Sequence, residues 1–124
     1  MESESKKKLI MLVDDNPANL RIGKNVLSEK YTVATAPSAA KLFSLLENNQ
    51  PVLILLDIDM PGMDGYKAIE SLKLKQETKD IPVIFLTGMT DPREEEKGRA
   101  LGAVDFITKP FDPASLIACI EKYS

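Results

Sequence analysis

The sequence predicts an α/β fold in which helices cover both faces of a five-stranded parallel sheet. Short apolar segments that suit buried strands alternate along the chain with longer segments of helical periodicity. Strict alternation of this kind is typical of a parallel sheet with right-handed crossovers. Five strands favour the doubly wound order 2-1-3-4-5, whose switch point lies between the first and third strands. Ligands bind at the carboxyl ends of strands beside such a point.

Five short segments have the composition of strands. Most are unbroken apolar runs, as expected of strands buried on both faces, whereas the second alternates with polar residues, as expected at a sheet edge. In chain order the expected strands are Leu9–Val13, Tyr31–Thr35, Val52–Leu56, Ile81–Leu86 and Ala103–Ile107. We therefore expect Tyr31–Thr35 to be the edge strand.

Five longer segments have the periodicity of amphipathic helices and defined beginnings or ends. In chain order, we expect helices from Asn16-Pro17 to near Lys30, from Ser38 to Asn48, from Tyr66 to about Gln76, from Asp91-Pro92 to Gly102, and from Asp112 or Ser115 onward. The fourth helix is the weakest of these predictions, because Gly98 lies inside it and its apolar content is little more than Ala100 and Leu101.

The composition excludes several classes of function. The 124 residues include one cysteine, Cys119, so an internal disulfide is excluded, and the absence of histidine removes the base that zinc hydrolases and Ser-His or Cys-His enzymes require. A net charge of −3 leaves no electrostatic footprint for nucleic acid. With no apolar run of membrane-spanning length and no signal-peptide core, we expect a cytoplasmic protein, with a polar tail over residues 1–7 and one domain over 8–124.

Three carboxylates are expected to meet at the switch point. Asp14 and Asp15 follow the first strand, and Asp57 follows the apolar run of the third. Consecutive residues of a regular strand point to opposite faces, so Asp14 and Asp15 can share a site only if the strand has already ended at Asp14. Carboxylates this close repel one another unless a cation neutralises them, and an all-oxygen ligand set favours Mg²⁺ or Ca²⁺.

A metal ion beside an aspartate suggests a carboxylate nucleophile that forms an acyl phosphate. Phosphoryl transfer requires positive charge around the equatorial oxygens, which Lys109 can supply from the end of the fifth strand. Thr87, at the end of the fourth strand, can donate a hydroxyl hydrogen bond, and Gly88 beside it leaves room for a phosphoryl group. The sequence thus predicts a phosphoryl-accepting site.

Four motifs, each at an expected strand end, together resemble the receiver domain of two-component response regulators, which has a flavodoxin-like fold. The motifs are Val13-Asp14-Asp15, Leu56-Asp57-x-x-Met60-Pro61-x-Met63-Asp64-Gly65, Leu86-Thr87-Gly88 and Phe106-x-x-Lys109-Pro110-Phe111. The resemblance covers about Lys8 to Tyr123. It implies that Asp57 accepts a phosphoryl group from a histidine kinase or phosphotransfer protein. It also implies that Asp14 or Asp15, Asp57 and the backbone carbonyl of Asp59 hold Mg²⁺.

The resemblance also implies how a signal leaves the site. Lys109 would contact the phosphoryl group, and a cis peptide bond before Pro110 would orient it. Thr87 and Phe106 would form a switch pair that remodels the face made by the fourth helix, fifth strand and fifth helix. An element of marginal stability moves most easily, which fits the weak fourth helix. Such a protein takes and loses its own phosphoryl group and is not a turnover enzyme.

Two other functions are consistent with parts of the pattern. Asp57-Ile58-Asp59 resembles the Asp-x-Asp motif of haloacid-dehalogenase-like hydrolases, which would make the protein a small magnesium-dependent aspartyl phosphatase. That motif usually follows the first strand of the hydrolase fold, whereas Asp57 follows the third. The other alternative is a pseudo-receiver, an interaction module that takes no phosphate; loss of an acid or of the lysine would indicate it, and all are present.

The output of the switch is left open by these motifs. Residues 14–19 look like a variant found in hybrid kinases and in receivers joined to cyclic-dinucleotide enzymes. We expect either a stand-alone receiver that binds a downstream protein or a piece of a larger regulator, without direct contact with nucleic acid or membrane. The motifs name no cognate kinase, oligomeric state or acyl-phosphate lifetime.

Overall fold

The apolar strand segments form one parallel sheet in the computed structural model, which describes residues 7–60, 62–88 and 91–124. Its strands are β1 (Lys8–Val13), β2 (Tyr31–Ala36), β3 (Leu53–Asp57), β4 (Val83–Thr87) and β5 (Asp105–Thr108). Their order is β2-β1-β3-β4-β5, which confirms the predicted topology and the edge position of β2. Apart from Lys7, the expected polar tail lies outside the described residues.

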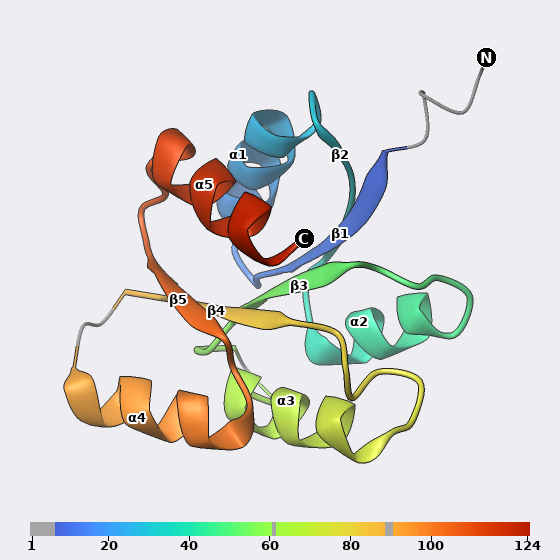
Figure 1. Cartoon of the computed structure of the whole chain (residues 1–124), viewed down its shortest axis with the longest axis vertical. Helices are drawn as coiled ribbons and strands as arrows, with labels where there is room; N and C mark the ends of the chain where they lie inside the picture. Colours follow the sequence, from blue (N-terminus) through green and yellow to red (C-terminus); the bar gives the residue numbers. More distant parts are fainter. Residues whose placement is uncertain (1–6, 61, 89–90) are drawn as a thin grey trace.

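Helices cover both faces of this sheet, as predicted (Figure 1). They are α1 (Pro17–Leu27), α2 (Ala39–Leu46), α3 (Gly65–Leu74), α4 (Pro92–Leu101) and α5 (Pro113–Tyr123). Helices α1 and α5 lie on one face, and α2, α3 and α4 lie on the other. Within the described part of the chain, no helix has the length and hydropathy needed to cross a bilayer.

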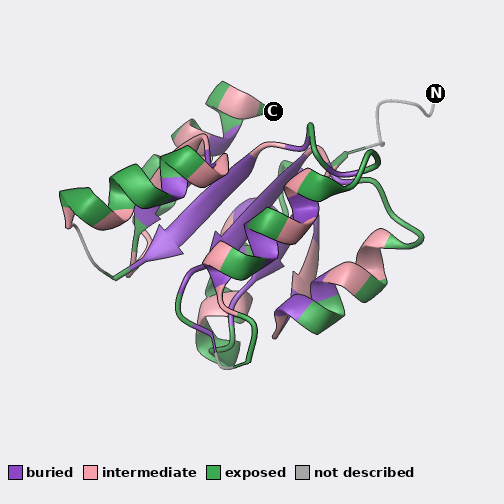
Figure 2. Cartoon of the chain, turned by 90° about the horizontal axis from the view of Figure 1, so that it is seen from below, coloured by how far each residue is buried: buried purple, intermediate pink, exposed green. Residues whose placement is uncertain are grey.

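The central strands are buried because successive side chains enter two different cores. In β1, for example, Met11 and Val13 pack toward α2 and α3, whereas Ile10 and Leu12 pack toward α1 and α5. Every residue of β3 and β4 is buried. Figure 2 shows this pattern as buried strands between helices whose outer faces are exposed. The unbroken apolar runs therefore indicated the correct position for these strands.

The predicted helix caps are confirmed, and the differences are at element ends. Asp112, not Ser115, caps α5, since its carboxylate accepts a hydrogen bond from the Ser115 amide at 3.0 Å. Helix α1 ends at Leu27, three residues before the expected Lys30. Strand β4 begins at Val83 rather than Ile81, as suits the intervening proline, which has no N–H for a sheet hydrogen bond.

Candidate functional site

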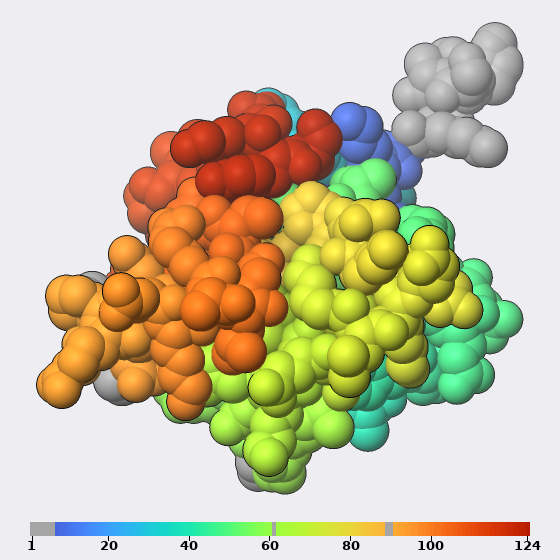
Figure 3. All heavy atoms as spheres, turned by 60° about the horizontal axis from the view of Figure 1, so that its bottom comes forward, coloured from blue at the N-terminus to red at the C-terminus, as the bar shows by residue number. Residues whose placement is uncertain are grey.

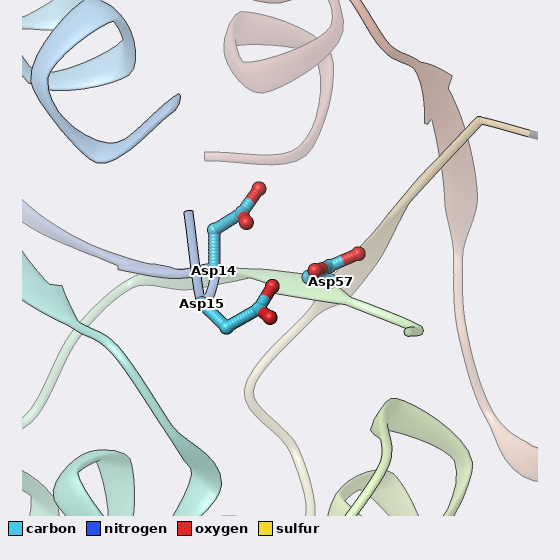
Figure 4. A group of neighbouring side chains, drawn as sticks. All are labelled: Asp14, Asp15 and Asp57. Carbon is cyan, nitrogen blue, oxygen red and sulfur yellow. The ribbon is translucent and has the colours of Figure 1, made fainter. Parts of the chain in front are cut away.

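Asp14, Asp15 and Asp57 come together at the carboxyl ends of β1 and β3, as predicted (Figure 4). One carboxylate oxygen from each residue lies within 4.8 Å of one oxygen from each of the other two. Strand β1 ends at Val13, so Asp14 and Asp15 no longer alternate across the sheet and can face the same crevice. Asp14 and Asp57 are almost fully buried, with exposed fractions of 0% and 1%, whereas Asp15 is exposed.

The turn after β1 holds the Asp14 carboxylate in place. Asp14 Oδ1 accepts a hydrogen bond from the Asn16 amide at 2.9 Å, and Asp14 Oδ2 accepts one from Asn19 Nδ2 at 3.2 Å. The sequence indicated Asn16 only as a helix cap and gave no indication of a role for Asn19. The position of Asn19 in the sequence could have suggested its role, because it lies in the first turn of the helix that begins beside the Asp14 carboxylate.

Lys109 supplies one positive charge to the three carboxylates. Its ammonium nitrogen lies 3.0 Å from Asp57 Oδ1 and 3.4 Å from Asp14 Oδ2. The backbone amide of Lys109 donates to the Thr87 carbonyl at 2.8 Å, which places the lysine beside the end of β4. The Lys109–Pro110 peptide bond is cis, in agreement with the expectation from the receiver resemblance.

Burial dominates the electrostatics of the cluster. The pKa of Asp57 is raised to about 6, because desolvation, the largest cause, and the charge of Asp14 together outweigh the hydrogen bond and charge of Lys109, which lower it. For Lys109, burial alone lowers the pKa, but the hydrogen bond and charge of Asp57 and the charge of Asp14 outweigh it, so the pKa is raised. The cluster is therefore short of positive charge.

The residues present fit a divalent cation. Asp57 Oδ1 accepts hydrogen bonds from Lys109 and, at 3.3 Å, from the Asp59 amide, but no described residue hydrogen-bonds to the buried Asp57 Oδ2. A buried carboxylate oxygen without a donor is costly, and coordination of a hard cation satisfies it. Two further carboxylates within reach complete an all-oxygen donor set.

The two residues of the expected switch pair lie on neighbouring strands. Thr87 is buried at the end of β4, next in sequence to Leu86, the strand partner of Asp57. Phe106 lies on β5 and is partly buried, with its ring centroid 5.7 Å from that of Phe85. Thr87 and Phe106, with Ile58 of the loop after β3, line a common cavity of about 90 Å³. The structure thus brings the pair together beside the acidic cluster.

Gly65 packs directly against the backbone of Asp57 and Ile58, so a larger residue at this position should destabilise the protein. The Gly65 amide donates to the Ile58 carbonyl at 2.8 Å, and a Cβ at Gly65 would lie 2.5 Å from the Asp57 carbonyl oxygen and 2.7 Å from the Ile58 Cα. Because these neighbours are backbone atoms, Gly65→Ala is expected to destabilise the protein by about 2–3 kcal/mol in urea denaturation. Gly88→Ala is the control, since no atom of the described residues lies within 4 Å of that Cβ. Equal stability of the two variants would contradict the prediction.

A doubly wound parallel sheet with a carboxylate cluster and a lysine at the carboxyl ends of its strands is the arrangement of a receiver domain. The model of the response regulator receiver domain family matches residues 10–121. The chain belongs to this family, and its function is that of a signalling switch in a two-component system.

Curated relatives carry the same domain within longer chains. A probable cyclic di-GMP phosphodiesterase of Vibrio cholerae is 42% identical over 101 residues, which are 82% of this chain and 23% of that protein. The response regulator PleD of Caulobacter vibrioides is 38% identical over 90% of this chain and 25% of its own length. The chain thus spans about a quarter of the length of these relatives.

A solved receiver domain has a similar fold. The receiver domain of a sensor histidine kinase from Pseudomonas aeruginosa is 26% identical, with a TM-score of 0.86 over 95% of this chain and 98% of that chain. That structure has a magnesium ion coordinated in its active-site cleft.

Proposed function

We propose that Asp57 is the phosphoacceptor of a phosphorylation-dependent signalling switch. The observation that carries this proposal is the buried Asp57 carboxylate, which has one oxygen bound by Lys109 and the other without a donor among the described residues. A carboxylate that is poorly solvated and held against a cation is suited to act as a nucleophile. The domain over which we propose this function is residues 8–124.

The reaction is a transfer of a phosphoryl group between two nucleophiles. A carboxylate oxygen of Asp57 forms a bond to phosphorus as the nitrogen–phosphorus bond of a phosphohistidine breaks, and the electron pair of that bond remains on the imidazole nitrogen. The donor is therefore a sensor histidine kinase or a histidine phosphotransfer protein. Lys109, 3.0 Å from the nucleophile, stabilises negative charge on the equatorial oxygens of the transferred group.

Mg²⁺ is the cofactor that we propose for this site, held by Asp14, Asp15, Asp57 and the backbone carbonyl of Asp59. It supplies Lewis-acid neutralisation of charge on the phosphoryl oxygens. The Asn16 amide and the Asn19 side chain keep the Asp14 carboxylate oriented for this task. Asp15 is exposed, so it faces the side from which solvent and donor approach.

The output step uses Thr87 and Phe106. A phosphoryl group on Asp57 is an acceptor for the Thr87 hydroxyl, and movement of Thr87 toward it changes the cavity that Thr87 shares with Phe106. We propose that this repositions the face formed by α4, β5 and α5, which then binds an output domain or a downstream protein in the cytoplasm. The protein acts by this single modification rather than by catalytic turnover.

The first test is formation of the phosphoryl adduct. Purified protein incubated with Mg²⁺ and acetyl phosphate is expected to gain the mass of one phosphoryl group by intact-mass spectrometry, and Asp57→Asn is expected to gain none. Asp80→Asn, which removes an exposed carboxylate in the loop before β4, is the matched control and should retain the adduct.

Three other outcomes would overturn the proposal. An adduct retained in Asp57→Asn would place the phosphoryl group elsewhere. No adduct in the wild-type protein with Mg²⁺ would indicate a pseudo-receiver. Continuous phosphate release without an adduct would indicate an aspartyl phosphatase.

A further inference from the structure

Helices α3 and α4 lie side by side on one face of the molecule (Figure 3) and are joined by a contact that the switch described above does not use. The hydroxyl of Tyr66, in the first turn of α3, donates a hydrogen bond of 2.5 Å to Glu94 Oε1, in the first turn of α4. Burial and the adjacent Glu94 carboxylate raise the pKa of Tyr66, so its hydroxyl keeps the proton that it donates.

The Tyr66 ring contacts Phe85 of β4 and Lys97 of α4. Its edge meets Phe85 at a centroid distance of 5.6 Å and an interplanar angle of 76°, the edge-to-face geometry that aromatic pairs favour. The ammonium group of Lys97 lies 4.3 Å from the ring centroid. In the chain, Tyr66 follows Gly65, which packs directly against the backbone of Asp57 and Ile58. Phe85 and Gly65 thus fix Tyr66 to the sheet, whereas Lys97 is a second contact between Tyr66 and α4.

Glu94, in contrast, lies on α4, the helix that we expect to move when the switch pair rearranges. The cavity shared by Thr87 and Phe106 is also lined by Glu94, so a change in that pair alters the space beside the first turn of α4. Among the described residues of α4, only Gly98 is buried. A Cβ at Gly98 would lie 2.6 Å from the tip of the Phe106 ring, so the helix backbone rests on the ring that is expected to shift.

The Tyr66–Glu94 hydrogen bond therefore spans a fixed element and a movable one. We propose that Tyr66 is a positioning residue of the switch, which holds α4 in its resting place through Glu94 and so opposes activation. The bond is made in the resting arrangement and is lost when Thr87 and Phe106 rearrange. This inference rests on the proposed function of Asp57, since it concerns the equilibrium that phosphorylation shifts.

Removal of the Tyr66–Glu94 hydrogen bond should shift the equilibrium of the protein from the resting state toward the active state. A group that stabilises only the resting state lowers the apparent affinity for any ligand that selects the active state. One net hydrogen bond corresponds to about a fivefold change in that affinity. Tyr66→Phe deletes the hydroxyl and keeps the ring, so the packing against Phe85 and Lys97 is preserved.

The test is the affinity for beryllium trifluoride with saturating Mg²⁺, measured by isothermal titration calorimetry. This probe mimics a phosphoryl group on an aspartate and so selects the active state. Tyr66→Phe is expected to bind it about fivefold more tightly than the wild-type protein, and Glu94→Ala should act similarly. The double variant should bind no more tightly than either single variant, since all three lack the same bond. Tyr31→Phe, which removes a hydroxyl at the sheet edge near Ser124, is the control and should match the wild-type protein.

The outcomes separate this inference from the proposed function. If the wild-type protein binds the probe and both single variants bind it with the same or lower affinity, Tyr66 has only a structural role and the inference is wrong. If the two single variants gain affinity but their effects add in the double variant, the hydrogen bond is not the cause, and the inference is also wrong. If the wild-type protein does not bind the probe at all, the proposed function fails and the inference fails with it.

Discussion

Lys109→Met is expected to destabilise the metal-free protein by about 3 kcal/mol. The substitution removes the ammonium group that lies 3.0 Å from Asp57 and 3.4 Å from Asp14, and leaves two buried carboxylates without a cation. Removal of one partner of a buried ion pair costs about 3–5 kcal/mol. The lower end applies here because 21% of the Lys109 side chain is exposed.

Chemical denaturation at pH 7 with a chelator measures this loss. Mg²⁺ should then stabilise the Lys109→Met variant by more than it stabilises the wild-type protein, because the cation replaces the missing charge and no longer competes with the lysine. Lys41→Met, which changes an exposed lysine of α2, is the matched control and should have little effect in either condition. Two results would show that the lysine does not neutralise the carboxylates. One is a Lys109→Met variant as stable as the wild-type protein, and the other is a variant whose stability does not change when Mg²⁺ is added.

Asp57→Asn is expected to have the opposite effect and to stabilise the metal-free protein by about 2 kcal/mol at pH 7. Burial raises the pKa of Asp57 from 3.8 to about 6, so the charged carboxylate costs the folded state up to about 3 kcal/mol at neutral pH. Part of the gain is offset because asparagine makes a weaker hydrogen bond to Lys109.

The pH dependence gives this prediction a definite sign. Since the pKa of Asp57 is higher in the folded state, its contribution to stability is most favourable below about pH 4 and is lost as the pH rises through 6. The gain in unfolding free energy of Asp57→Asn over the wild-type protein should therefore be near zero at pH 4 and largest at pH 7. Denaturation curves of both proteins at the two pH values test this, and a difference independent of pH would contradict it.

The two substitutions should also be coupled. In an Asp57→Asn background, Lys109→Met leaves only Asp14 as a buried charge near the missing lysine, so its destabilising effect should be smaller than in the wild-type protein. Equal effects in the two backgrounds would mean that Asp57 and Lys109 do not interact in solution. Together these results would separate the electrostatics of the site from its phosphoryl chemistry.

Local pattern was sufficient to predict most of the fold. Unbroken apolar runs indicated strands buried on both faces, and side chains such as Asn16, Ser38 and Asp91 indicated helix starts, because both signals depend on residues close in the chain. The strand order then placed Asp14 and Asp57 at one crevice. Element ends were less accurate: β5 begins at Asp105 rather than Ala103, since strand pairing decides where a ladder begins.

What the sequence alone predicted was therefore the topology and the acceptor site, since both follow from residue type and position at strand ends. The folded structure was needed to show that Asn19 holds Asp14, that Asp57 Oδ2 is buried without a donor among the described residues, and that Tyr66 reaches Glu94. These features depend on the direction of individual side chains. The Tyr66–Glu94 contact in addition joins residues 28 positions apart, so it depends on how two helices pack, which no local pattern encodes.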